Sequence, residues 1–290
     1  MRPHPLHRAS ARVLLLGAAA LAAACDEPQP PATITLDFRG LVDGAPFACG
    51  QRYEGIGTTA AAFEPLDFRM YLHEFVILDS RGEEHLASPI DDDRWQRDPF
   101  VLVDFEDATG ACATGSPSTH TSVELSNDEG AWPVGVAFSI GLPPEHNHLD
   151  AATAPAPLNE PGMWWSWRGG YKYVRADVQT DGGTPFYFHL GGTGCGGDVA
   201  SGFACEYPNI SRIELPELDT EREQITVDLA RLYDGVDITA PTDFAVDSVP
   251  GCMAFPGDPE CPKMFDAVGL AFESTSQGAG QAMFGTEVRE

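Results

Sequence analysis

Three histidines in two short stretches of the sequence are the best candidates for binding a metal ion. The stretch PPEHNHLD places His146 and His148 two residues apart. In an extended chain alternate side chains point to one face, so both imidazoles and Asp150 would share a side. The stretch PFYFHLGGTGC resembles a strand in which Tyr187 and His189 share a face. Because imidazole suits copper and zinc, the pattern predicts a metal site if the fold joins the two stretches.

A cluster of tryptophans is the second unusual feature. The stretch GMWWSWRGGYKYVRAD holds Trp164, Trp165 and Trp167, three of the five tryptophans in the chain. In an extended chain Trp165 and Trp167 face one side and Trp164 faces the other. These rings are either ordinary packed aromatics or an exposed face that binds a glycan or peptide. The histidines have a similarly plain alternative, as loop residues and one core residue, and spacing alone does not decide between these interpretations.

The first 25 residues have the form of an export signal. Three arginines precede an apolar run that is too short for a membrane span, and small residues then lead to Cys25. This end resembles a bacterial lipobox, which predicts lipidation of Cys25 and a location in the periplasm or outer cell envelope. A Pro-rich tether at residues 26–32 follows. The formal net charge of −27 excludes binding to nucleic acid, and leaves the lipid anchor as the expected membrane contact.

The remaining six cysteines predict disulfides, because they are even in number and the chain is exported. Closure of short loops favours Cys195–Cys205 and Cys252–Cys261, which leaves Cys49–Cys112. A cysteine metal site is the weaker interpretation, since no CxxC pair occurs.

Residues 33–290 are expected to form one all-β domain, an antiparallel β-sandwich with long disulfide-pinned loops. Apolar and polar residues alternate in several short runs separated by turn signals, and 24 prolines and 30 glycines interrupt helical periodicity. Only Leu229 to Tyr233 suggests a helical turn. The expected strands lie within residues 32–40, 68–80, 100–107, 121–127, 133–143, 171–180, 185–192, 212–218 and 224–233.

Several of these stretches, in order, resemble the MbnP-like family, also described as metallo-mystery pair four-Cys motif proteins. The matching stretches are FACGQRYEGIGTT, DFRMYLHEFVILD, VLVDFEDATGAC, FSIGLPPEHNHLD, PLNEPGMWWSWRGGYKYVRAD, FHLGGTGC and CEYPN. They extend from about Thr33 to Glu287. The resemblance implies a mainly β, exported protein of periplasmic copper homeostasis that binds Cu(I) or Cu(II) and has no catalytic activity of its own.

The resemblance also implies a partner and a set of site residues. The partner is a di-haem, MauG-like cytochrome c peroxidase that oxidises one tryptophan to kynurenine, which then helps to bind copper. By motif, His148 and His189 are the expected ligands, with His146 as a further candidate. Trp165, then Trp167, is the expected modified residue, and Trp164 is a third candidate because it departs from the family pattern. The four motif cysteines correspond to the set Cys49, Cys112, Cys195 and Cys205.

Overall fold

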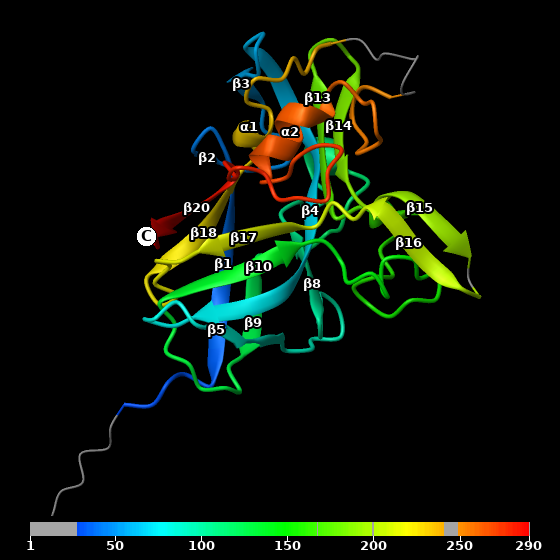
Figure 1. Ribbon diagram of the computed structural model, residues 1–290. Coiled ribbons are helices and arrows are strands. Elements are labelled where there is room, and N and C mark those ends of the chain that lie inside the picture. The colour runs from blue at the N-terminus through cyan, green and yellow to red at the C-terminus, as the bar shows by residue number, and fades with distance from the viewer. Residues whose placement is uncertain (1–27, 167, 199, 241–248, 290) are drawn as a thin grey trace, which may run out of the picture.

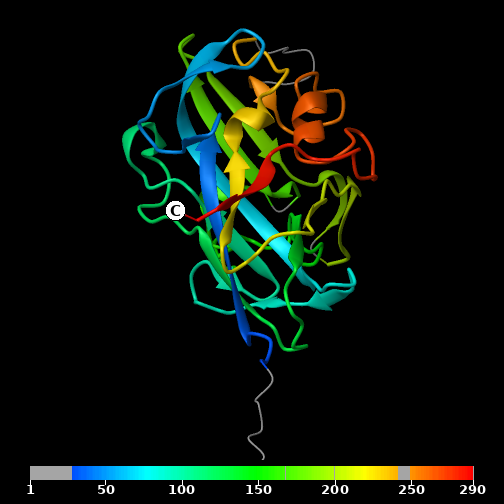
Figure 2. The same ribbon diagram turned by 90° about the vertical axis from the view of Figure 1, so that its left-hand side faces the viewer.

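The computed structural model describes residues 28–166, 168–198, 200–240 and 249–289. The expected export signal with Cys25, and Trp167 in the tryptophan cluster, lie outside the described residues. Two β-sheets pack face to face, with most strand pairs antiparallel, as the sequence predicts (Figures 1 and 2). The described residues contain no helix long and apolar enough to cross a membrane.

The smaller sheet is built around β1, in which Ile34, Leu36 and Phe38 are buried and alternate with more exposed residues. This alternation explains why the segment forms a strand with one face on the core. The strands of this sheet are β1 (Thr33–Val42), β2 (Ala45–Pro46), β6 (Ser88–Pro89), β9 (Ser122–Ser126), β18 (Glu223–Asp228) and β20 (Phe284–Val288). The pairing of β1 with β18 is parallel, with Phe38 beside Ile225.

The larger sheet is built around one long strand, β4 (Ala61–Leu78), most of which is buried. It starts several residues before the strand expected from sequence and pairs with β3, β5, β8, β10 and β13. The other strands are β3 (Tyr53–Ile56), β5 (Glu84–Leu86), β7 (Gln96–Arg97), β8 (Phe100–Asp104), β10 (Gly135–Ile140), β13 (Val174–Thr180), β14 (Pro185–Leu190), β17 (Ser211–Leu215) and β19 (Gly251–Cys252). The edge pair β14–β19 is parallel, so the sandwich is mixed rather than wholly antiparallel.

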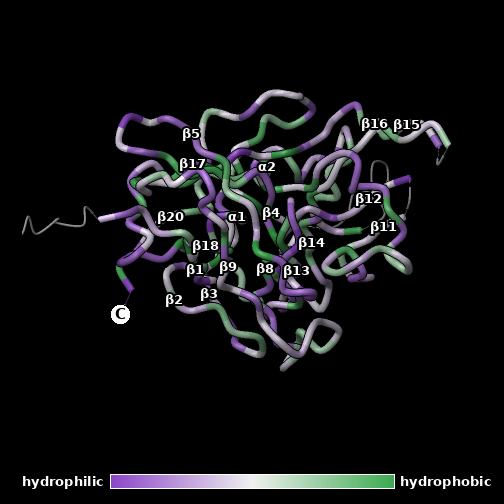
Figure 3. Tube along the Cα trace, turned by 90° about the horizontal axis from the view of Figure 1, so that it is seen from below, coloured by the Kyte–Doolittle hydropathy of each residue, from purple (hydrophilic) through white to green (hydrophobic). Residues whose placement is uncertain are grey.

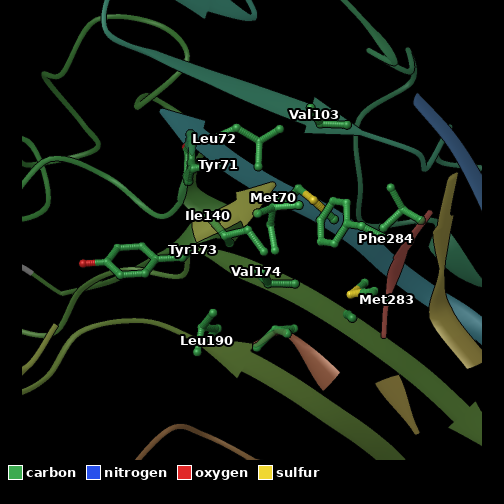
Figure 4. Packing of buried hydrophobic residues seen from close by; sticks show 14 of the residues in the cluster. Met70, Tyr71, Leu72, Val103, Ile140, Tyr173, Val174, Leu190, Met283 and Phe284 are labelled. Carbon is green, nitrogen blue, oxygen red and sulfur yellow. The ribbon is translucent and has the colours of Figure 1, made fainter. Parts of the chain in front are cut away.

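The two sheets enclose one apolar core. Phe38 of β1 meets Phe138 of β10 with ring centroids 5.9 Å apart, and Phe138 meets Phe284 of β20 at 5.7 Å. Figure 4 shows Met70 near Val174 and Ile140, and Phe284 beside Met283. This packed layer gives β13 and β14, which carry part of the candidate site, a rigid support.

In the described part of the chain, two hairpins and four short helices lie outside the two main sheets. The hairpins are β11 (Trp164–Ser166) with β12 (Gly170–Tyr171), and β15 (Thr193–Asp198) with β16 (Gly202–Tyr207). Figure 3 shows both hairpins at one end of the molecule, opposite the C-terminus. The helices are η1 (Gly110–Cys112), η2 (Pro161–Met163), α1 (Leu229–Leu232) and α2 (Cys261–Ala267). Helix α1 lies at the turn expected from sequence, whereas α2 was expected to be a loop.

The described residues contain three disulfides, and they are the pairs favoured by sequence: Cys49–Cys112, Cys195–Cys205 and Cys252–Cys261. The second joins β15 to β16, and the third joins β19 to the start of α2.

Candidate metal centre

His189 lies on β14 in the larger sheet and is 8% exposed. Its Nε2 is 2.9 Å from Oδ1 of Asp177, on the neighbouring strand β13. Its ring is 5.5 Å from that of Tyr187, so the two share a face as the sequence predicts. Among the described residues, the buried Nδ1 atom of His189 has no hydrogen-bond partner. An imidazole held at one nitrogen and open at the other is the usual arrangement of a histidine that binds metal.

Asp177 belongs to a buried network of alternating charges. Its Oδ2 accepts from Nε of Arg175 at 2.7 Å, and Nη1 of Arg175 is 2.9 Å from Oδ2 of Asp67. Asp67 also accepts from Nε of Arg69 at 2.8 Å. Both aspartates are fully buried, and Arg69 is 1% exposed. Buried charges are retained only when paired in this way, so the network fixes the faces of β4 and β13 behind His189.

The same buried environment determines the charges of His189 and Asp177. Burial lowers the pKa of His189, although Asp177 acts to raise it, so the imidazole is neutral at pH 7. Burial would by itself raise the pKa of Asp177, but the interactions with His189 and Arg175 outweigh this effect and lower it. Asp177 is thus a carboxylate, and the neutral ring is in the form that metals bind.

Trp165 lies beside His189 in the hairpin of β11 and β12. Its ring is half-buried, and its centroid is 6.2 Å from the ring centroid of His189. The ring of Phe255 stacks on it, with centroids 6.2 Å apart and an interplanar angle of 24°. A Cβ added at Gly191 would lie 2.6 Å from Cζ3 of Trp165 and 2.8 Å from the carbonyl oxygen of Tyr171. Glycine at position 191 is therefore what allows the indole to approach the strand that carries His189.

A cavity of about 590 Å³ opens in front of Trp165. Aromatic, thioether and aliphatic side chains form much of its wall, and Arg168 is the cationic residue in it. The lining residues are Trp165, Ser166, Arg168, Gly169, Gly192, Thr193, Gly194, Cys195, Val249, Met253 and Phe255. The walls are therefore suited to a soft metal ion or an apolar group rather than a hard, hydrated cation.

His148 approaches this region from the turn that follows β10. Its Nε2 is 3.5 Å from Sγ of Cys205 and 3.3 Å from Nδ2 of Asn147, and its ring stacks on Phe203 at 4.6 Å. The sulfurs of Cys195 and Cys205 form a disulfide, so they are not thiolate ligands beside His148. The hairpin of β15 and β16 instead acts as a wall that orients this imidazole.

The segment Gly191–Gly192 connects the surroundings of the two histidines. A Cβ at Gly192 would lie 3.1 Å from Sγ of Cys205, the atom that also contacts His148. Gly191 meets Trp165 on the other side. Asn147 adds a second connection, because its Oδ1 accepts from the backbone nitrogen of Tyr171 at 3.0 Å, in the tryptophan hairpin. The contacts of Gly191 with Trp165 and of Gly192 with Cys205 thus connect the surroundings of Trp165 with those of His148.

The expected common face of His146 and His148 is wrong. Residues 144–148 form turns rather than a strand, so the alternation rule does not apply. His146 packs instead against Phe100 of β8, with ring centroids 5.0 Å apart. Trp164 is also directed elsewhere: its Nε1 donates to the carbonyl of Leu149 at 3.1 Å, and its ring packs on the core.

Both a family model and a solved structure match this chain. The model of the MbnP family matches residues 31–254. This chain belongs to the MbnP family. Its structure is similar to that of MbnP from Methylosinus trichosporium, with a TM-score of 0.76 and 27% identity over 89% of this chain and 99% of that one. No significant match was found among curated proteins.

The match to the MbnP model ends at residue 254, inside the loop closed by Cys252 and Cys261. Phe255, which covers Trp165, lies just beyond it and was missed in the sequence. Asp177 and Asn147 were missed too. Asp177 had one usable signal, since Arg175, Asp177 and Gln179 alternate with apolar residues and so share one face of β13. Asn147 and Phe255 lie in turns, where sequence periodicity gives no orientation.

Proposed function

We propose that this member of the MbnP family is an exported copper-binding protein of periplasmic copper homeostasis, with no catalysis of its own. Membership of the family suggests a copper protein. The observation that carries the proposal is the approach of Trp165 to His189, whose Nδ1 is buried and has no partner in the described part of the chain. His148, across Gly192, supplies a second imidazole.

The donor set fits copper better than a hard cation. The neutral imidazole of His189, a second imidazole from His148 and an apolar wall that includes Met253 suit Cu(I) or Cu(II). In the proposed site His148 and His189 hold the ion, the Cys195–Cys205 hairpin limits access of water, and Asp177 orients His189. The copper is cargo that the protein binds and releases.

We propose that Trp165 is oxidised to kynurenine before copper binds, by a di-haem, MauG-like cytochrome c peroxidase that uses hydrogen peroxide. The C2–C3 bond of the indole breaks and each carbon gains one oxygen atom, a four-electron oxidation that consumes two equivalents of hydrogen peroxide and releases two of water. Hydrolysis by a further water then releases the formyl carbon as formate. The product has an aromatic amine and a ketone where the indole had only an N–H donor. Trp165 is favoured over Trp164, because Trp165 lies beside His189 and the cavity. The acidic surface would help to dock a basic face of the partner.

The alternative function is a secreted recognition module that binds a glycan or peptide through exposed tryptophans. Such a module needs flat, solvent-exposed indole faces. Trp165 instead is half-buried under Phe255, and Trp164 packs on the core. Among the described tryptophans of the cluster, neither presents such a face, and this favours the copper proposal.

The test uses protein co-expressed with its di-haem peroxidase and supplied with peroxide. Tandem mass spectrometry of the peptide that spans residues 164–167 should locate kynurenine at Trp165. The matured protein should bind one equivalent of copper, and the His148→Ala/His189→Ala variant should bind none with measurable affinity. His146→Ala is the matched control, since His146 packs on Phe100, and it should bind copper like the parent.

Two results would count against the proposal in different ways. Equal copper affinity of the double variant and the parent would exclude these ligands. Unmodified tryptophan throughout the peptide, obtained with a demonstrably active peroxidase, would exclude the maturation step and leave the histidine ligands to be judged by the titration.

A further inference from the structure

We propose that Asp177 is a positioning residue that holds His189 in the Nε2–H tautomer and thereby presents Nδ1 to the metal. The inference rests on the proposed function, because it concerns the same site. It adds which atom of His189 binds copper and which residue makes that choice.

The first step is the contact between the two side chains. Asp177 is fully buried, and its Oδ1 lies 2.9 Å from Nε2 of His189. A carboxylate only accepts hydrogen bonds, so Nε2 must carry the proton of a neutral ring. Nδ1 then carries a lone pair that can accept a hydrogen bond or bind a metal ion. This atom is buried and has no partner among the residues that the structure describes. A buried acceptor without a partner is costly, whereas a bound metal ion would satisfy it.

The second step is the immobility of the carboxylate itself. Oδ2 of Asp177 accepts from Nε of Arg175 at 2.7 Å, and Arg175 is in turn held by Asp67 at 2.9 Å. Both oxygens of Asp177 are therefore occupied by donors on opposite sides. The carboxylate cannot rotate away from His189 without breaking the contact with Arg175.

The third step extends the network to the tryptophan hairpin. The carbonyl oxygen of Gly162 accepts from Nζ of Lys172 at 2.8 Å and from Nη1 of Arg175 at 3.4 Å. Gly162 lies in η2, directly before β11, which carries Trp165. Arg175 thus contacts both the residue that orients His189 and the turn that precedes Trp165. The network sets the position of the imidazole relative to the indole.

The Asp177→Asn variant separates the proposal from a purely structural role for Asp177. The proposal predicts a change of tautomer in this variant. Arg175 donates through Nε, so the amide oxygen of asparagine should face Arg175 and its NH₂ group should face His189. His189 must then accept at Nε2 and carry its proton at Nδ1, the atom that faces the site. If Asp177 served only to pair with Arg175, the variant would lose stability without changing the tautomer.

The experiment measures ¹⁵N chemical shifts of histidine side chains in metal-free protein at pH 7, with His189 assigned by comparison with His189→Gln. The parent should show a protonated Nε2 and an unprotonated Nδ1, and Asp177→Asn should show the reverse. Copper affinity of Asp177→Asn should fall by about 10- to 100-fold, the usual cost of losing the partner of a histidine ligand. Asp67→Asn is the matched control: it changes a buried carboxylate of the same network without touching His189, so the tautomer should stay as in the parent.

A parent protein whose His189 carries its proton at Nδ1 overturns the inference, and this measurement needs no variant to fold. Unchanged copper affinity of a folded Asp177→Asn protein also overturns it. If the parent has the expected tautomer but binds no copper, the proposed function fails while the effect of Asp177 on His189 stands.

Discussion

His189 and His148 belong to the same candidate site but are held by different physical means. His189 lies on a paired strand, and its imidazole is oriented by Asp177 within a network of buried charges. His148 lies in a turn, and its imidazole is oriented by Phe203 and by the sulfur of Cys205. The first side of the site depends on the core of the larger sheet, and the second depends on a hairpin outside it (Figure 1).

Because they are held differently, the His189 side and the His148 side of the site should respond to different substitutions. Burying several charges costs free energy that is recovered only if every partner is present. The network around Arg69 and Arg175 is therefore sensitive to the loss of one member. The hairpin of β15 and β16 has glycine at several positions and little burial, so its shape relies on the covalent bridge Cys195–Cys205. Substitutions that act on one side and spare the other are the way to test the contrast.

The largest effect is expected for Arg69→Met, on the His189 side. Arg69 pairs with Asp67 and lies 3.3 Å from Glu160 and 3.8 Å from Glu106. Methionine keeps much of the apolar stem but leaves buried carboxylates uncompensated. The free energy of unfolding should fall by about 3–5 kcal/mol, measured by urea denaturation.

Arg52→Met is the control for Arg69→Met. Arg52 also forms a two-pronged pair with an aspartate, Asp181, but both side chains are substantially exposed. Water and salt screen such a pair, so stability should hardly change. Equal losses for the two variants would contradict the view that the network behind His189 owes its importance to burial.

The next largest effect is expected for the Cys195→Ser/Cys205→Ser variant, on the His148 side. The bridge closes a loop with a sequence separation of 10, and its removal should cost roughly 2–4 kcal/mol. Copper affinity should fall because Cys205 no longer orients His148. The ¹⁵N shifts of His189 in metal-free protein should remain those of the parent.

Removing Cys252 and Cys261 by the same substitutions is the matched control for this bridge. It deletes a loop of similar separation, 9, that carries Phe255 rather than a neighbour of His148. A shift in the His189 signals after loss of Cys195–Cys205 would show that the two sides of the site are not independent.

The contrast also explains which features could be predicted from the sequence. The strand of His189 was predictable, because Phe186, Phe188 and Leu190 alternate with it and the core imposes that alternation. Two of the disulfides were predictable from short loop closure, and Cys49–Cys112 was the pair that remained. The direction of His146 was not, because residues 144–148 adopt turns, in which successive side chains follow no period.

The buried network was beyond sequence reasoning for a different reason. Asp67, Arg69, Asp104 and Asp177 are polar residues in strands, where the alternation rule places polar side chains toward solvent. Their burial follows from pairings between β4, β8 and β13 that only the fold defines. The parallel pair β1–β18 was missed similarly, since its strands are far apart in the chain and pairing direction leaves no local signal.

The smallest effect is expected for Asp104→Asn at pH 4, and the growth of this effect with pH sharpens the account of the network. Burial raises the pKa of Asp104 to about 8, and Glu106 adds to the rise while Arg69 opposes it. The folded protein therefore keeps a proton that the unfolded chain releases above about pH 4. The stability that Asp104 contributes is fully present below about pH 4. As the pH rises from 4 toward 8, the free energy of unfolding falls by at most about 1.4 kcal/mol per pH unit.

Asparagine resembles the protonated form of Asp104 and keeps Oδ1, which accepts from the backbone nitrogen of Glu106 at 3.1 Å. Urea denaturation at pH 4, where Asp104 is substantially protonated in both states, should therefore give nearly the stability of the parent, whereas the variant should become increasingly the more stable protein as the pH rises from 4 to 8. Asp93→Asn, at a side chain 98% exposed, should leave the parent's pH profile unchanged. A parallel profile for Asp104→Asn and the parent would mean that Asp104 is ionised throughout, and that the buried network holds one more negative charge than its pairing implies.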